Sequence, residues 1–408
     1  MALHFAEYAS RLAVALAAKH EVLLLLRASN ADNELTADLR GLVERSVDVR
    51  YLKVRRHRDP RVLGTSVAIN RAIRRFSPAV LHVQELNPLL GGWTIVSLRK
   101  NVPVVVTVHD PVSHSGGPPT NGLFWKTVMW LRRRASRLIV HGPRMQAELE
   151  GLDGDLAKRV DVIPHGVLGQ TGIDQPVAAG EPATFLFFGR VESYKGLRYL
   201  LDANDILRSR RHASKLIIAG VGPDLETHRP RLAASTCVEL IDRYVPAADV
   251  ASLFRRSTAV VLPYTDATQS GVAAIAFANS CPVIATAVGD LPDIVIPGRT
   301  GLIVPPCDGN CLADAMETLI GDRGLRDLLA AGAGEYAKEI LSWSRIAELT
   351  EATYYRALAS HRGHHATEPS VADESTRSRI GGEAPASTAP RSDGEPSAAT
   401  RPRRTGSY

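Results

Sequence analysis

Short apolar runs alternate with longer amphipathic segments along most of the chain. The first half opens with apolar residues at helical spacing up to about Ala18, followed directly by a buried-type strand at 22–26. Further strand-like runs lie at 47–54, 79–84, 103–110, 136–142 and 160–166. Helix-length segments separate them, and this alternation predicts an α/β domain with a parallel sheet and helices on both faces.

The same pattern pauses and then restarts in the second half. Residues 168–182 are rich in Gly and Pro and indicate an interdomain linker. Strand-like runs return at 184–190, 215–220, 238–241, 259–264 and 282–288. The sequence therefore predicts two doubly wound domains, at 1–167 and 183–340.

The two ends of the chain depart from this pattern. A doubly wound domain normally opens with a strand at the centre of its sheet, but here the helical pattern comes first. Either the domain starts upstream of Met1 or it is built without its central strand. At the other end, helical periodicity runs from 310 to about 359, and 361–408 has almost no large apolar residues, which predicts a disordered tail.

Composition narrows the protein class. With 408 residues, 45% of them apolar, the chain can bury two cores. The four cysteines form no CxxC pair and no zinc-type cluster, so we expect reduced thiols in a cytoplasmic protein. A net charge of +6 suits anionic partners such as nucleoside diphosphates, and we expect no nucleic-acid partner. No apolar run is long enough to predict a membrane span, and residues 1–20 lack signal-peptide features.

Cationic side chains follow the first strand of the second domain. Gly189 directly follows the apolar run, and Arg190 and Lys195 come next. Ligands bind at the carboxyl ends of strands in α/β folds, where a guanidinium and an ammonium can neutralise a diphosphate. The alternative is two solvated surface cations.

A second candidate anion site lies in the stretch "ATQSGVAAIAFANS". The turn Gln269-Ser270-Gly271 precedes a helix, which would leave the N–H groups of Gly271, Val272 and Ala273 free for an anion. The alternative is an ordinary helix cap by Ser270.

Two further strand ends carry candidate residues. In "IIAGVGPD", Gly220 and Gly222 resemble part of a dinucleotide fingerprint, but the third glycine is absent, so a tight turn is favoured over a dehydrogenase site. His109 ends the run "VVVTVHD", where it can hydrogen-bond a sugar hydroxyl or a phosphate. The alternative is a histidine satisfied by local backbone.

The segment 123–134 combines aromatic residues with an arginine cluster. An amphipathic helix of this kind can lie on an acidic membrane, as a peripheral contact at its inner face. The alternative is that its aromatic residues pack on the domain's own sheet.

From about Phe5 to Ala359 the chain resembles a retaining glycosyltransferase of family 4 with the GT-B fold. The matching stretches, in order, are "VTVHD", "VIPHGV", "FGRVESYKGLRYLLDA", "IIAGVGPD", "LPYTDATQSGV", "PVIATAVGDLPDIVIPGRTGLIVPP" and "SWSRIAE". The resemblance implies two Rossmann-like domains facing a cleft, with the nucleotide sugar held by the second and the acceptor by the first. It also implies that a helix at 341–360 crosses back onto the first domain.

The resemblance implies roles for named residues. Arg190 and Lys195 would bind the donor diphosphate beside Gly189, and His109 would face the donor sugar. The base would lie near the backbone of Tyr244 and Val245. The set Gln269, Ser270, Gly271 and Val272 would complete the donor site. Catalysis would need no metal and no cofactor, because the cations and a helix N-terminus stabilise the leaving diphosphate.

The chain departs from the common family pattern at two positions. The two glutamates that the family carries eight positions apart fall here on Ala267 and Ile275. The "ATQSGV" stretch resembles a recurring family variant, which favours transfer of a hexose to a glycan or lipid-linked polysaccharide precursor. Two alternatives are a non-catalytic nucleotide-sugar-binding or scaffold protein, and a GT-B epimerase, which would need acid/base carboxylates that the sequence hardly offers.

Overall fold

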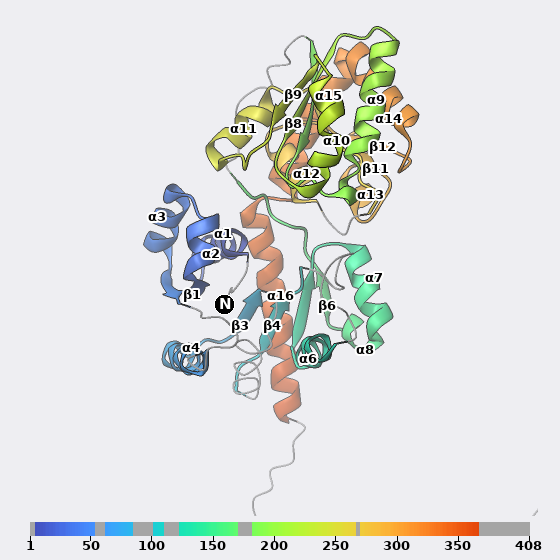
Figure 1. Cartoon of the computed structure of the whole chain (residues 1–408). Helices are drawn as coiled ribbons and strands as arrows, with labels where there is room; N and C mark the ends of the chain where they lie inside the picture. The colour runs from blue at the N-terminus through green and yellow to red at the C-terminus, as the bar shows by residue number, and fades with distance from the viewer. Residues whose placement is uncertain are drawn as a thin grey trace, which may run out of the picture. The chain divides into compact units, whose positions relative to one another are not determined.

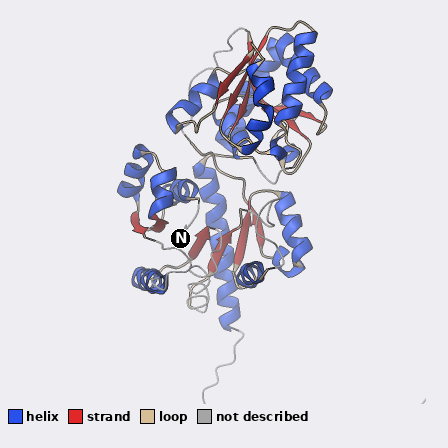
Figure 2. Ribbon diagram, in the orientation of Figure 1, coloured by secondary structure: helices blue, strands red, loops and turns tan. Residues whose placement is uncertain are grey.

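The computed structural model of the chain describes residues 5–53, 62–84, 101–109, 122–169, 182–266 and 270–366. These residues form helices and parallel sheets (Figures 1 and 2). Most of the predicted linker at 168–182 and of the predicted tail at 361–408 lies outside the described residues.

The second half of the chain builds one six-stranded parallel sheet with the order β12-β11-β10-β7-β8-β9. Its strands are β7 (Ala183–Phe188), β8 (Ser214–Ala219), β9 (Val238–Ile241), β10 (Ala259–Leu262), β11 (Val283–Thr286) and β12 (Gly301–Val304). The first strand in sequence, β7, therefore pairs on both sides, with β8 and with β10. This is the 3-2-1-4-5-6 strand order of doubly wound folds.

Helices cover both faces of this sheet. Along β7, Leu186 belongs to one apolar core, whereas Phe185 and Phe187 belong to the other, as the period-two alternation of a strand requires. The helices are η1 (Ser193–Lys195, a 3₁₀ turn), α9 (Leu197–Ser209), α10 (Pro223–Ala233), α11 (Ala247–Arg255), α12 (Gly271–Ala278), α13 (Leu291–Ile294), α14 (Gly309–Gly321) and α15 (Arg323–Glu339).

The first half of the chain builds its sheet in two pieces. One piece is the pair β1-β2 and the other has the order β3-β4-β5-β6, all parallel. The strands are β1 (Leu23–Arg27), β2 (Asp48–Leu52), β3 (Leu81–Gln84), β4 (Val104–Thr107), β5 (Arg137–Val140) and β6 (Val160–Val162). The helices are α1 (Ala6–Leu16), α2 (Ala28–Glu34), α3 (Ala37–Ser46), α4 (Val62–Phe76), α6 (Leu123–Arg132), α7 (Pro143–Leu152) and α8 (Gly154–Ala157).

Helices also lie on both faces of the larger piece. Val105 of β4 packs with residues of α1, while its neighbours Val104 and Val106 pack with Ile69 and Ile73 of α4. The two pieces follow the order of the second sheet with its central position left vacant among the described residues.

The last helix, α16 (Trp343–Ala366), packs on the N-terminal strands. Its Trp343 indole donates a hydrogen bond to the carbonyl of Val167 (2.7 Å), and its Tyr354 hydroxyl lies 2.7 Å from His82 Nδ1 in β3. The helix continues to Ala366, so the prediction that the tail begins at 361 is wrong for its first residues. The first proline after Trp343 is Pro369, and helices usually end before the residue that precedes a proline.

Most predicted strands are confirmed with shorter bounds, and one strand was missed. The run Gly301–Val304 forms β12, which pairs in parallel with β11. It begins with a glycine and is followed by two prolines, so only three consecutive apolar residues mark it in the sequence.

Candidate functional site

The carboxyl end of β7 leads into a tight turn at Gly189. This residue has φ 101°, a conformation that favours glycine, and its N–H donates to the carbonyl of Ala219 (2.9 Å). A β-carbon built on it would lie 3.1 Å from Lys195 Nζ and 3.7 Å from Val272 Cγ2. The missing side chain therefore lets β7, η1 and the start of α12 meet at one point.

Lys195 is the buried cation of this meeting point. It is 8% exposed, and its Nζ lies 5.5 Å from the centre of the Tyr264 ring. Burial, and next the positive charge of Arg190, lower the pKa of Lys195 from its ordinary 10.5 to about 8, while Glu192 acts in the opposite direction. A buried ammonium beside a second cation is stabilised by an anion, which makes this pair a candidate anion site.

Arg190 is the exposed partner of the pair. Its side chain is 79% exposed, and its Nη1 lies 3.8 Å from Glu192 Oε1. A guanidinium with this exposure can reach a phosphate without leaving a buried ion pair behind. The structure thus brings two predicted residues together, one buried and one exposed.

Ser270 caps α12, as the simpler interpretation proposed. Its Oγ accepts a hydrogen bond from the N–H of Ala273 (3.4 Å), and its carbonyl accepts from the same group (3.2 Å). The expectation that the Ala273 N–H is free is therefore wrong. Within the described part of the chain, no acceptor is recorded for the N–H groups of Gly271 and Val272, which lie at the positive end of the helix dipole.

Tyr264 contacts both Lys195 and Ser270, the cap of α12. The sequence analysis did not predict this residue. It follows β10, is 3% exposed, and its hydroxyl is hydrogen-bonded with Ser270. Burial raises the pKa of the phenol, which stays protonated beneath Lys195. Its position just after an apolar run is the same signal that singled out Arg190.

For the other residues predicted to contact the donor, the structure gives burial and position in the fold but no contact with Lys195. Tyr244 and Val245 follow β9, at the same edge of the sheet; Tyr244 is 79% exposed and Val245 is buried. Gln269 lies outside the described residues, as does Ala267. Ile275 packs against the apolar core, so this position serves packing.

The prediction of a tight turn at Gly220 is confirmed. Its φ is 146°, and a β-carbon there would lie 1.9 Å from the Gly189 carbonyl oxygen. Close contact between the two backbones thus requires this glycine.

His109 lies inside the N-terminal domain rather than on its surface. It is 7% exposed, Phe5 stacks on its ring (centroids 3.7 Å apart), and its Nε2 lies 3.1 Å from Gln84 Oε1. Its Nδ1 lies 3.1 Å from Nε2 of His141. The structure does not test its predicted contact with a donor sugar.

Three histidines cluster here, which the sequence analysis did not predict. His109, His141 and His165 bring ligand atoms within 4.8 Å of one another. They follow β4, β5 and β6, so neighbouring parallel strands place them at one edge. Burial lowers the pKa of all three, so they are neutral near pH 7.

Hydrogen bonds already occupy this trio. His141 donates from Nδ1 to the carbonyl of Ile163 (3.0 Å), and its other nitrogen faces His109; His165 Nδ1 lies 2.8 Å from the carbonyl of Gly166. A metal ion would have to break the bond between His109 and His141, so the geometry favours a hydrogen-bonded network.

The aromatic and basic residues of α6 and of the two positions that follow it differ in burial. Trp125 packs against the core with the buried Arg132 guanidinium 5.2 Å from its ring centre. Trp130 is 40% exposed, with the Arg134 guanidinium 3.3 Å from its ring centre, and Arg133 pairs with Asp153. Packing on the sheet therefore accounts for one face only. Among the described helices, none is long and apolar enough to cross a membrane.

Two family profiles match the chain. The profile described as "Glycosyltransferase Family 4" matches residues 6–167, and that described as "Glycosyl transferases group 1" matches residues 182–322. Similar curated proteins include the D-inositol 3-phosphate glycosyltransferase of Pseudarthrobacter chlorophenolicus, 32% identical over 56% of this chain and 58% of that protein. The glycogen synthase of Mycobacterium tuberculosis is 28% identical over 72% of each chain.

Solved structures of similar fold include the sucrose-phosphate synthase of Thermosynechococcus elongatus (TM-score 0.63, 21% identity, 86% of this chain and 92% of that one). Another is Anabaena Alr3699/HepE in complex with UDP (TM-score 0.62, 17% identity, 85% of this chain and 96% of that one). At these identities the likeness shows the fold alone.

The lowered pKa of Lys195 gives a testable pH dependence. Between about pH 8 and 10.5 the unfolded state binds the proton that the folded lysine has lost, so the free energy of unfolding rises with pH in this window. Below pH 8 the folded state carries the full burial cost. We expect Lys195→Met to raise the free energy of unfolding at neutral pH by about 1–3 kcal/mol and to remove this rise.

Urea unfolding from neutral to alkaline pH measures both effects. Lys215→Met, which removes an exposed lysine of β8, is the matched control and should follow the parent. An identical pH profile for Lys195→Met and the parent would contradict the buried position of the ammonium.

Proposed function

Because the chain belongs to glycosyltransferase family 4 and has the GT-B fold, we propose that it transfers a hexose from a nucleoside-diphosphate sugar to a glycan or lipid-linked polysaccharide precursor. The anomeric configuration is retained, the donor binds the C-terminal domain, and the N-terminal domain takes the acceptor. One observation carries the proposal: Lys195 and the start of α12 come together at Gly189, beside the carboxyl ends of β7 and β10, and the charge of Arg190 acts on Lys195.

The donor diphosphate lies between these groups in the proposed complex. As the bond between the sugar C1 and the phosphate oxygen breaks, negative charge grows on the leaving diphosphate. Arg190, Lys195 and the N–H groups of Gly271 and Val272 are the preorganised donors that stabilise this charge. An anion here also favours the charged form of Lys195, so its pKa rises on binding.

We further propose that the base is uracil. The structures of HepE were solved with UDP, with UDP and glucose, and with UDP-glucose. In the proposed complex the base contacts the exposed Tyr244 and the backbone of Val245. Both residues follow β9 at the same sheet edge. Positions 267 and 275 carry Ala and Ile, so neither supplies a carboxylate to the donor nucleotide.

The two missing carboxylates also support a second candidate, a protein that binds nucleotide sugars without turnover. Ile275 is part of the apolar packing of α12, so the position has a structural role and the ribose needs another partner. The two candidates share the diphosphate site and differ only in whether the sugar is transferred.

Arg190→Ala tests the diphosphate assignment. We expect it to weaken UDP binding, measured by calorimetry, about 10- to 100-fold, because a charge-assisted contact of about 1.5–3 kcal/mol is lost. Thermal stability should stay close to that of the parent, since the Arg190 side chain is 79% exposed.

Arg208→Ala is the matched control, because Arg208 is an exposed arginine in the last turn of α9, the helix that follows Lys195. Unchanged UDP affinity in Arg190→Ala would rule out its contact with the diphosphate. Binding by the parent without sugar release from UDP-glucose, across glycan and lipid-linked acceptors, would favour the non-catalytic candidate.

We also propose that α6 makes a peripheral contact with an anionic membrane surface through Trp130, Arg133 and Arg134. Trp130 is 40% exposed on α6, and Arg133 and Arg134 directly follow the last residue of this helix. An amphipathic aromatic ring beside basic groups suits the headgroup region.

Flotation with vesicles of phosphatidylcholine and phosphatidylglycerol measures this contact. We expect binding that weakens with salt, and a loss of about fivefold in Arg134→Gln, because each basic residue near such a surface contributes about 1 kcal/mol. Leu328→Ala removes an apolar side chain that is exposed, like that of Trp130, but lies on α15, and this variant should float like the parent. Equal flotation with neutral and anionic vesicles would contradict the proposal.

A further inference from the structure

The turn that follows β7 holds a carboxylate among its cations. Glu192 lies between Arg190 and Lys195 in the sequence, and its Oε1 lies 3.8 Å from Arg190 Nη1. Its negative charge also acts on Lys195, where it favours the charged ammonium. The carboxylate therefore offsets part of the positive charge at the point where the donor diphosphate is proposed to bind.

The backbone around Glu192 is fixed on both sides. The N–H of Val191 donates to the carbonyl of Val221 (2.9 Å), and the carbonyl of Glu192 accepts from the N–H of Lys195 (2.9 Å). Glu192 precedes η1 in an extended conformation, and its side chain makes no cap hydrogen bond with that helix. The main chain thus holds the carboxylate beside the two cations, and capping does not explain why it is there.

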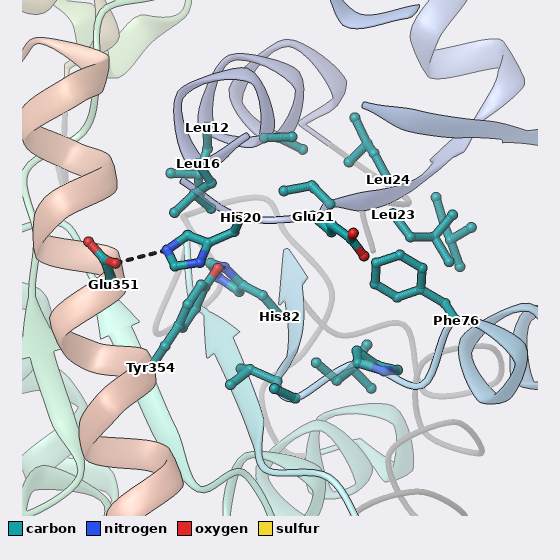
Figure 3. Close-up of a pocket in the computed structure, with 18 of the residues that line it drawn as sticks. Leu12, Leu16, His20, Glu21, Leu23, Leu24, Phe76, His82, Glu351 and Tyr354 are labelled. Carbon is teal, nitrogen blue, oxygen red and sulfur yellow. Dashed lines mark hydrogen bonds and ion pairs between the residues drawn. The ribbon is translucent and has the colours of Figure 1, made fainter. Parts of the chain in front are cut away.

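A carboxylate with a structural role in this molecule has different contacts. Glu351 of α16 lies on the wall of a cavity of about 450 Å³ in the N-terminal domain (Figure 3). Its Oε1 lies 2.8 Å from His20 Nε2 and its Oε2 lies 3.4 Å from Lys19 Nζ, which joins α16 to the residues after α1. Within the described part of the chain, no hydrogen bond is recorded for the carboxylate of Glu192, which is 29% exposed. Glu192 therefore acts on its neighbours through its charge.

The donor and the product of the proposed transfer differ in charge at this position. In a nucleoside-diphosphate sugar, the sugar esterifies the terminal phosphate, which then keeps a single negative charge. When the bond between the sugar C1 and the phosphate oxygen breaks, that oxygen retains the electron pair. The freed terminal phosphate takes up a second negative charge near neutral pH, because such a group titrates at about pH 6. A carboxylate beside this phosphate disfavours the product more than the donor.

We propose that Glu192 is a specificity-determining residue, whose carboxylate lowers the affinity of the site for the free nucleoside diphosphate relative to the nucleotide sugar. The inference rests on the proposed function, because it takes the diphosphate to lie against Arg190 and Lys195. The carboxylate also opposes the charge that grows in the transition state, where the two cations and the helix N-terminus outweigh it. Product release limits the turnover of many enzymes, so a lower affinity for the product favours turnover.

Two other roles for Glu192 predict different binding results. As an ion-pair partner that holds the Arg190 guanidinium in place, it would support the binding of every diphosphate alike. The separation of 3.8 Å is longer than a hydrogen bond, and Arg190 is 79% exposed, so this pair orients the guanidinium weakly. As a hydrogen-bond acceptor for a sugar hydroxyl, Glu192 would support the binding of the nucleotide sugar alone.

Glu192→Gln tests the proposal, because it keeps the size of the side chain and removes its charge. Calorimetry at about pH 7.5 measures the Kd of UDP and the Kd of UDP esterified with methanol on its terminal phosphate. The two ligands share the base, the ribose and both phosphates. They differ in the methyl group and in the second charge of the terminal phosphate, which UDP carries at this pH.

We expect Glu192→Gln to lower the ratio of the Kd of UDP to that of the methyl ester by about three- to tenfold, the range for a like charge at a partly exposed site. UDP-glucose should follow the methyl ester, because it carries the same charge. The change in the ratio should shrink as salt is added, because salt screens a partly exposed carboxylate.

Glu339→Gln is the matched control. It removes the same charge from an ion pair with Arg299 (3.1 Å), a residue that precedes β12 at the opposite edge of the sheet, and it should leave the ratio unchanged. An unchanged ratio in Glu192→Gln, an equal loss of affinity for both ligands, or weaker binding of UDP-glucose alone would overturn this proposal and leave the diphosphate site in place. Absence of UDP binding by the parent would overturn the proposed donor site and this inference with it.

Discussion

Parallel pairing of β7 with β8 on one side and β10 on the other is the interaction on which the candidate donor site depends. The register joins Phe188 to Ala219 and Leu186 to Val260, so the turns after these strands emerge at one edge. Lys195 follows β7, whereas Tyr264 and the cap of α12 both follow β10, so the pairing of β7 with β10 brings the two connections together. A ligand that contacts all three must bind at that edge of the sheet.

The charge of the site follows from this packing. Lys195 is buried by the turn that Gly189 permits, and a buried ammonium with a lowered pKa gains stability from a bound anion. The same packing brings the Val272 side chain, in the first turn of α12, to Gly189 beside Lys195. In the proposed donor complex, cations, peptide groups and a helix dipole hold the diphosphate without the two carboxylates that the family usually carries here.

Much of this arrangement was predictable from local sequence patterns. Strand ends are marked by apolar runs followed by Gly or by polar residues, which located Arg190, Lys195, Ser270 and His109. Contacts between strand ends were not predictable, because they depend on strand order. The ring of Tyr264 under Lys195 and the clustering of three histidines are of this kind. The strand β12 was missed because a glycine begins it and two prolines follow it, which leaves only three apolar residues in a row.

The two sheets also differ in completeness. In the C-terminal sheet the central strand β7 is buried and paired on both sides, whereas the described N-terminal strands leave that position open. The C-terminal sheet therefore pairs its six strands without any described strand of the N-terminal half.

The measurement that tests the central claim most directly is a crystal structure of the chain with UDP. The account predicts the β-phosphate within hydrogen-bond distance of Lys195 Nζ and of the N–H group of Gly271 or Val272, with the Arg190 guanidinium turned toward the same phosphate. Phosphates bound elsewhere, with Lys195 still packed only against the Tyr264 ring, would contradict it.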